Sequence, residues 1–232
     1  MGELVLIKII SQITMKRVEI SLFDGVTPTA IVGSTNANPS VLTTGAHGLT
    51  TGDRVLVFGH GVNTTVNGIF KAVVLSTTTL SLKDEFTGAD IAGIGIGIGT
   101  GAICKAPPII RAEGMEKCVV ELALEGTPTL TLKMVGANGK SFANTALLSN
   151  PRRDLPNIGA TQSAQNPWSV IGFQNRQSMA NVDGATGIAP AGAPQFTTIS
   201  FENGLTKYMT LILTAWTAGA ITAKAVLFDS SR

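Results

Sequence analysis

Apolar and polar residues alternate over much of this chain. Residues 17–23 (RVEISLF), 117–125 (KCVVELALE) and 130–135 (LTLKMV) each place their apolar side chains on one face. A period of two is typical of antiparallel strands that bury one face. Towards the end of the sequence, KYMTLILTAW and ITAKAVLF predict two more strands, and the TAGA between them predicts a hairpin. No segment keeps a helical period over three turns, so the sequence predicts an all-β protein.

The predicted strands fall into distinct zones. Residues 39–103 hold short strands separated by turns rich in Gly and Thr, whereas the strands before and after them are longer. The strand at 17–23 has no partner within this central block, so we expect it to pair with strands that follow the block. The predicted fold is an antiparallel β-sandwich of residues 15–38 and 104–232 with an inserted small β-barrel module at 39–103.

The first residues of the chain form a candidate contact arm. They are apolar, but Lys8 interrupts them, and they fall well short of the ~20 apolar residues of a membrane span. They also lack the basic start and the cleavage site of a secretory signal. We expect residues 1–14 to be an N-terminal arm that docks on a neighbour through Leu4, Leu6 and Ile9. A frayed terminus or a further strand is the alternative.

A second candidate contact region is the long irregular loop at 137–195, which is rich in Asn, Gln, Gly, Ala and Pro. Loops of that length are unusual in compact domains and are often functional. We interpret it as an interaction loop whose anchors are Trp168 and Phe173. The alternative is that these two aromatic side chains pin the loop onto its own domain.

Charged residues are scarce, at 14% of the chain compared with about 25% in ordinary globular proteins. The net charge of +2 and the absence of long basic runs argue against a nucleic-acid partner. A surface that is polar without being charged suits a protein partly covered in an assembly.

The two cysteines, Cys104 and Cys118, lie in apolar surroundings. We predict buried free thiols, with a single disulfide as the alternative.

Two glycine-containing segments invite comparison with phosphate-binding loops. The run GIGIGIGTG, residues 93–101, lacks the glycine offsets of a dinucleotide fingerprint, and prolines in the following AICKAPPII exclude a helix. We instead predict a strand that closes the barrel, with Ile94, Ile96 and Ile98 filling the interior and a bare glycine face opposite. In VGANGKS, the first glycine that a P-loop requires falls on Met134, and a simple turn explains the segment.

Other catalytic patterns are also missing from the sequence. His47 and His60 have only Asp53 nearby as a further metal ligand. No G-x-S-x-G motif occurs, and no pair of carboxylates stands out. We therefore expect a non-enzymatic protein with no catalytic residue, metal or cofactor.

Residues 41–82, VLTTGAHGLTTGDRVLVFGHGVNTTVNGIFKAVVLSTTTLSL, resemble a small β-barrel module that is widespread in structural proteins of tailed bacteriophages. The module is also similar to a half-domain of ubiquitin-activating enzymes. The shared pattern is a strand, HGLTTGD, a strand, N-x-x-x-N-G, a strand and TTTLSL. Within GLTTGD, we expect glycines at positive φ and an Asp53 side chain that bonds neighbouring backbone amides. In phage proteins the module implies no catalysis.

A second resemblance involves the flanking strands. VELALEGTPTLTLKMVGANGKSF, together with the later YMTLILTAWTAGAITAKAVLF, is similar to β-sandwich domains of phage virion proteins, although the long middle loop departs from that pattern. The resemblance implies a virion protein, and we favour a capsid decoration (cement or head-fibre) protein that stabilises the shell by subunit contacts. Its expected partner is the major capsid protein, and its expected assembly is a homotrimer, with no nucleic acid or membrane bound.

The alternative is a tail, baseplate or receptor- or glycan-binding component of the virion. A glycan site stacks a sugar ring on an exposed aromatic side chain. The candidates for such stacking are Trp168, Tyr208 and Trp216.

Overall fold

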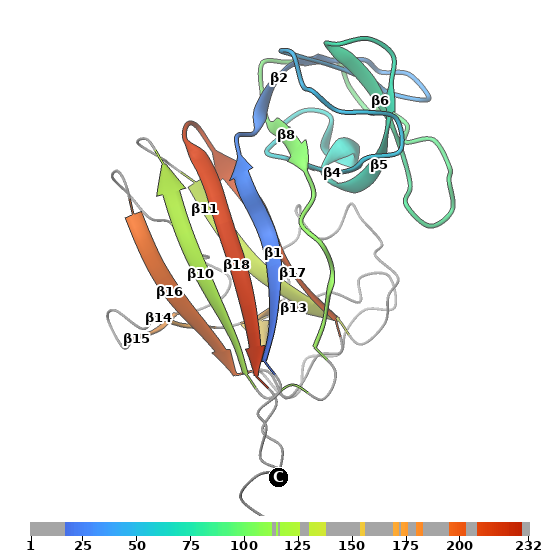
Figure 1. The fold of residues 1–232 in the computed structure, drawn as a ribbon. Helices are drawn as coiled ribbons and strands as arrows, with labels where there is room; N and C mark the ends of the chain where they lie inside the picture. The colour runs from blue at the N-terminus through green and yellow to red at the C-terminus, as the bar shows by residue number, and fades with distance from the viewer. Residues whose placement is uncertain are drawn as a thin grey trace, which may run out of the picture.

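The structure is a computed structural model that describes residues 17–112, 115, 117–125, 130–137, 154–155, 169–171, 173–175, 180–182, 195–202 and 208–228. Over these residues the chain is all-β, as predicted: an antiparallel β-sandwich carries a small closed β-barrel at one end (Figure 1). None of the described residues belongs to a helix long and apolar enough to cross a membrane.

The sandwich consists of two sheets that face each other (Figure 1). The first sheet has the order β1 (Arg17–Val26), β18 (Ala220–Phe228), β10 (Lys117–Glu125), β16 (Gln195–Glu202), β14 (Phe173–Asn175), β15 (Ala180–Val182). The second has the order β12 (Asp154–Leu155), β13 (Ser169–Ile171), β11 (Leu130–Ala137), β17 (Tyr208–Trp216), β9 (Ile110–Arg111). All of these pairings are antiparallel except β12 with β13.

The alternating pattern of the sequence accounts for the sandwich core. One face of each long strand contributes apolar side chains to a single cluster that spans both sheets. The strand at 17–23 pairs with β18, as expected, through a register that runs from Arg17 opposite Phe228. Buried members of the cluster from β1, β10, β11, β17 and β18 are Leu22, Phe23, Cys118, Val120, Leu122, Leu132, Tyr208, Met209, Leu211, Ile212, Leu213, Ile221, Ala223, Ala225 and Leu227.

The predicted hairpin of β17 and β18 is wrong, because the two strands belong to different sheets. The short link between them crosses from one sheet to the other; Gly219 takes a φ of +89°, and Trp216 Nε1 donates a hydrogen bond to its carbonyl at 3.0 Å. A turn sequence specifies that the chain reverses, and it does not specify edge-to-edge pairing. Here residues of both strands belong to one core cluster, so the strands meet across the core of the sandwich.

The loop predicted at 137–195 is not wholly irregular. Strands β12 to β15 lie within that range, and they add to sheets that longer strands have already formed. Val170, for example, pairs with Val135 of β11, and Gln174 pairs with Ser200 of β16. Strands of two or three residues are too short to show a sequence period, so the alternation of residues could not reveal them.

The barrel closes through six antiparallel strands. Their order is β3 (Val41–Thr44), β6 (Thr79–Lys83), β5 (Gly68–Val74), β4 (Arg54–Phe58), β8 (Ala102–Lys105), β2 (Thr29–Ser34), and β2 pairs back onto β3. A further strand, β7 (Gly97–Ile98), lies beside β2, and a 3-10 turn, η1 (Thr64–Val66), precedes β5. The interior holds Ile31, Leu42, Leu49, Val55, Val57, Val66, Phe70, Ala72, Leu80, Leu82 and Ile103.

The module predicted at 39–103 therefore starts too late, because β2 belongs to the barrel sheet. This short strand places Ile31 in the barrel interior, and it is needed to close the sheet between β8 and β3. The resemblance begins only at residue 41, which is why it missed this strand. The turn chemistry in GLTTGD is as predicted: Gly48 and Gly52 have positive φ, and the Thr50 amide donates to Asp53 Oδ2 at 2.9 Å.

Barrel and sandwich share a hydrophobic joint. Along β4, Val55 and Val57 point into the barrel, whereas Leu56 and Phe58 point outwards and pack into the sandwich cluster. Ile69, Ala102 and Cys104 join that cluster from β5 and β8. The continuous packing from barrel wall to sandwich core explains how the barrel is held at a fixed place on the end of the sandwich.

A partly buried ion pair reinforces the same joint. Arg54 Nε donates to both oxygens of the Glu85 carboxylate, at 2.8 and 3.0 Å, and Arg54 Nη1 donates to the Pro107 carbonyl at 2.5 Å. Pro107 lies in the segment through which the chain returns to the sandwich after β8. The guanidinium thus connects the barrel wall, a barrel loop and the returning chain.

We predict that Phe58→Ala lowers the free energy of unfolding by about 3–5 kcal/mol, because it leaves a cavity in the joint. Phe58 is buried at 1% exposure, whereas Phe86 is 49% exposed. The matched control Phe86→Ala should cost less than about 1 kcal/mol. Chemical denaturation followed by tryptophan fluorescence measures both values; equal losses in the two variants would contradict a packed joint.

Candidate interaction surface

Three isoleucines of the glycine run project into solvent from the flank of the barrel. Ile94, Ile96 and Ile98 are 59%, 73% and 82% exposed, and we call them the isoleucine ridge. Val32 and Val62, each 52% exposed, lie near the run: the Gly99 amide donates to the Val32 carbonyl at 3.1 Å, and Val62 lies against the glycine face at Gly95. Exposed apolar residues are ordinary when they are scattered, but a contiguous group marks a contact site.

The prediction that these isoleucines fill the barrel is therefore wrong: the glycines face inwards. Only Gly97–Ile98 forms a strand, which pairs with β2 through Ser34 opposite Gly97 and Gly33 opposite Ile98. A Cβ added at Gly95 would lie 2.9 Å from Val62 Cγ1, and one added at Gly93 or Gly97 would overlap its neighbours more severely. The glycine face has room for backbone alone, because residues 34–36 and 60–63 pack directly against it.

The imidazole of His60 is the main neighbour of the glycine face. A Cβ at Gly97 would overlap His60 Cε1 and would lie 2.8 Å from Nε2. The ring is 1% exposed, and its Nδ1 accepts a hydrogen bond from the Asn63 amide at 3.1 Å, which assigns the ring proton to Nε2. The Asn67 side chain clamps the His60 backbone: its Oδ1 accepts from the amide and its Nδ2 donates to the carbonyl, both at 2.9 Å.

Asn63 anchors the start of the ridge. This side chain is fully buried; its Nδ2 donates to Ser40 Oγ at 3.0 Å, and its Oδ1 accepts from the Ile94 amide at 3.2 Å. Further along, the Gly97 amide donates to Ser34 Oγ at 3.2 Å. Because buried polar groups are costly when they are unpaired, these bonds hold the backbone beneath the ridge in one place.

The chemistry of this buried cluster is structural. Ser34 and His60 both lie beneath Gly97, but His60 Nε2 makes no hydrogen bond, so it does not activate the Ser34 hydroxyl as a base would. Burial lowers the pKa of His60 below its ordinary value of 6.5 and keeps the ring neutral. A neutral ring can accept from the Asn63 amide, and a protonated ring cannot.

The structure does not describe the side chains of the five contact residues that the sequence predicted. Leu4, Leu6, Ile9 and Trp168 lie outside the described residues. Phe173 is the first residue of β14, and its side chain also lies outside what the structure describes.

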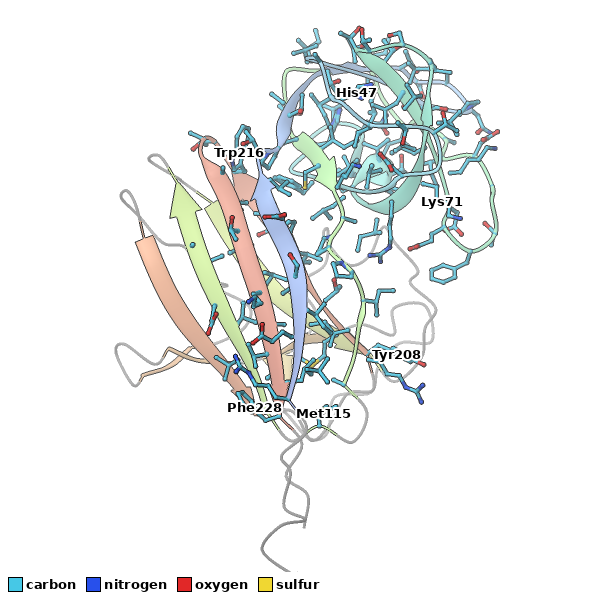
Figure 2. The ribbon with its side chains drawn as sticks, in the orientation of Figure 1. His47, Lys71, Met115, Tyr208, Trp216 and Phe228 are labelled. Atoms are coloured by element: carbon cyan, nitrogen blue, oxygen red, sulfur yellow. The ribbon has the colours of Figure 1, made fainter. Side chains whose placement is uncertain are left out.

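Two aromatic candidates for glycan stacking are described. Tyr208 is only 8% exposed, and Trp216 is partly buried against the sandwich core. Figure 2 shows Trp216 at the end of the sandwich next to the barrel and Tyr208 towards the opposite end. Neither side chain offers a free aromatic face of the kind that stacks on a sugar.

Histidines and cysteines have structural roles in the described part of the chain. His47 Nδ1 accepts from the Leu49 amide at 3.0 Å and its Nε2 lies 3.1 Å from the Ser76 carbonyl, so this ring joins two turns. No group of three His, Cys, Asp or Glu side chains that could hold a metal occurs among the described residues. Cys104 and Cys118 are buried free thiols, as predicted, and burial raises the pKa of each to about 12.

We predict that Gly97→Ala destabilises the protein by about 1–3 kcal/mol, because the added methyl group must displace the His60 ring. Gly33→Ala, on the paired strand, is the matched control, since its Cβ would meet only ordinary contacts at 3.7 and 3.9 Å. The control should stay within about 1 kcal/mol of the wild type. Denaturant titration of the three proteins tests the prediction, and a fully stable Gly97→Ala protein would contradict it.

Stability should also depend on the protonation of His60. The unfolded chain binds a proton near pH 6.5, whereas the folded chain resists it, so stability is complete above about pH 6.5 and falls as the pH drops below it. We expect the melting temperature to decrease between about pH 7.5 and about pH 5. In His60→Asn, whose Oδ1 can replace Nδ1 as acceptor, this decrease should be smaller. An identical pH profile for both proteins would argue against the buried neutral ring.

Comparison with known proteins does not place the chain in a family. No family model matches the sequence, and no curated protein matches it.

Proposed function

We propose that this chain is a non-enzymatic structural protein of a tailed-phage virion, of the capsid decoration type. The observation that carries the proposal is the architecture: a closed barrel interrupts a sandwich between β1 and β9, with sandwich strands on both sides of it in sequence. The two sequence resemblances imply a barrel and a sandwich of this kind in phage virion proteins. The exposed isoleucine ridge adds a surface suited to contacts between subunits.

The proposed role is mechanical. A decoration protein stabilises a shell by bridging neighbouring subunits, and it needs a rigid body with several contact surfaces. The joint around Phe58 and Arg54 supplies the rigidity, since it ties the barrel to the sandwich by packing and by hydrogen bonds. The surfaces that would contact the shell are those proposed from the sequence: the arm at 1–14 with Leu4, Leu6 and Ile9, and the aromatic residues Trp168 and Phe173. The major capsid protein is the proposed partner.

The copy number of the chain in purified virions tests this proposal. We expect quantitative mass spectrometry to find the protein in amounts comparable to the major capsid protein. A few copies per particle would favour the tail, baseplate or receptor-binding alternative over decoration. Absence of the protein from virions that are otherwise complete would overturn the structural role altogether.

Recombinant protein gives a second arm of the same test. Added to capsids that lack it, the protein should bind to saturation and raise the temperature at which the shells disassemble. Heat-unfolded protein, added at the same concentration, is the control. Binding with no effect on shell stability would contradict the cementing role.

A further inference from the structure

The isoleucines of the ridge are not explained by the stability of a single chain. Ile94, Ile96 and Ile98 bury little of their surface, while the glycines between them are required by the close approach of the barrel. A polar β-branched residue such as Thr would satisfy the same backbone at these positions. Three large apolar side chains in water, on a backbone held by Asn63 and Ser34, form a preorganised contact.

Among the described residues, the segments that contact the backbone of the ridge contain no charged side chain. Residues 25–52, 55–70 and 91–104 contain no Asp, Glu, Lys or Arg, and the segments that support the ridge come from these three stretches. Nucleic acid or anionic lipid would be recognised by basic side chains, and these three stretches supply none. An uncharged face does suit a symmetric contact, because a charge near a two-fold axis would face its own copy and be repelled.

The ridge is also symmetric in sequence. Residues 93–99 read GIGIGIG, which is identical in both directions about Ile96. A two-fold axis passing beside Ile96 would therefore place Ile94 of one copy against Ile98 of the other, and Ile96 against its own counterpart. In this arrangement each isoleucine meets an isoleucine, with no second binding surface required.

The ridge can supply the apolar centre of such a contact but not its whole area. Covering exposed isoleucine side chains removes apolar surface from water, which favours association. A stable interface needs about 800 Å² per partner, which is more than the ridge alone provides. The uncharged Thr, Ser and Asn residues of the three stretches around the ridge would form the polar rim.

We propose that the isoleucine ridge is a two-fold self-association site, at which a second copy of this chain packs antiparallel about Ile96. The contact differs from the homotrimer that we expect for a capsid decoration protein. A three-fold interface is heterologous and would place the ridge against a different surface of the next copy. The sequence symmetry of the ridge would then play no part in the contact. The proposal does not depend on the virion role, because self-association can be measured on the isolated protein.

Charge-swap variants at the proposed axis provide the test. Ile96→Asp and Ile96→Lys each place two like charges together across a two-fold axis, and we expect each to weaken self-association about 100-fold or more. Because Ile96 is 73% exposed, neither variant should unfold the protein, and an unchanged melting temperature verifies this. An equimolar mixture of the two variants should recover a dimer, because the carboxylate of one variant would then face the ammonium group of the other across the axis.

Sedimentation equilibrium of the full chain measures each outcome. We expect the wild type to be dimeric at about 100 µM. Leu75→Asp is the matched control: Leu75 is 56% exposed outside the ridge, and its variant should remain dimeric. A monomeric wild type, an assembly that persists in both charge variants, or a mixture that stays monomeric would each overturn the two-fold contact. None of these results depends on whether the protein is found in virions.

Discussion

The contact between the bare backbone of Gly97 and the buried ring of His60 determines how this part of the barrel faces the solvent. Because the ring occupies the space where a side chain would point, residue 97 must lack one, and its neighbours along the run must point outwards. The hydrogen bonds of Asn63 and Ser34 then fix the backbone in that orientation. An exposed apolar ridge is the consequence of tight packing on its other side.

Close packing also determines the joint between barrel and sandwich. β4 has two apolar faces, one for each core, so it forms part of both hydrophobic clusters. A strand that is buried on both faces cannot move relative to either body without exposing apolar surface. β4 therefore holds the barrel, which carries the ridge beside β2, firmly on the sandwich, and this lowers the entropic cost of any contact that the ridge makes.

The sequence predicted strands wherever the alternation was long enough, as in β1 and β10, where Leu22, Cys118, Val120 and Leu122 are buried as expected. It failed where the outcome depends on distant residues. A period of two defines two faces of the glycine run, but only the position of His60, which lies far earlier in the chain, decides which face is inside. The glycines themselves indicated which face is inside. A face that carries no side chains is the face against which neighbouring residues can pack closely.

Nuclear Overhauser effects in the isolated protein test the orientation of the glycine run most directly. The account predicts strong effects between the His60 Hε1 proton and the Gly97 Hα protons, and none between the Ile96 or Ile98 methyl groups and the barrel interior at Leu42 or Val57. Methyl contacts from Ile96 or Ile98 to those interior residues, with no contact between His60 and Gly97, would contradict it.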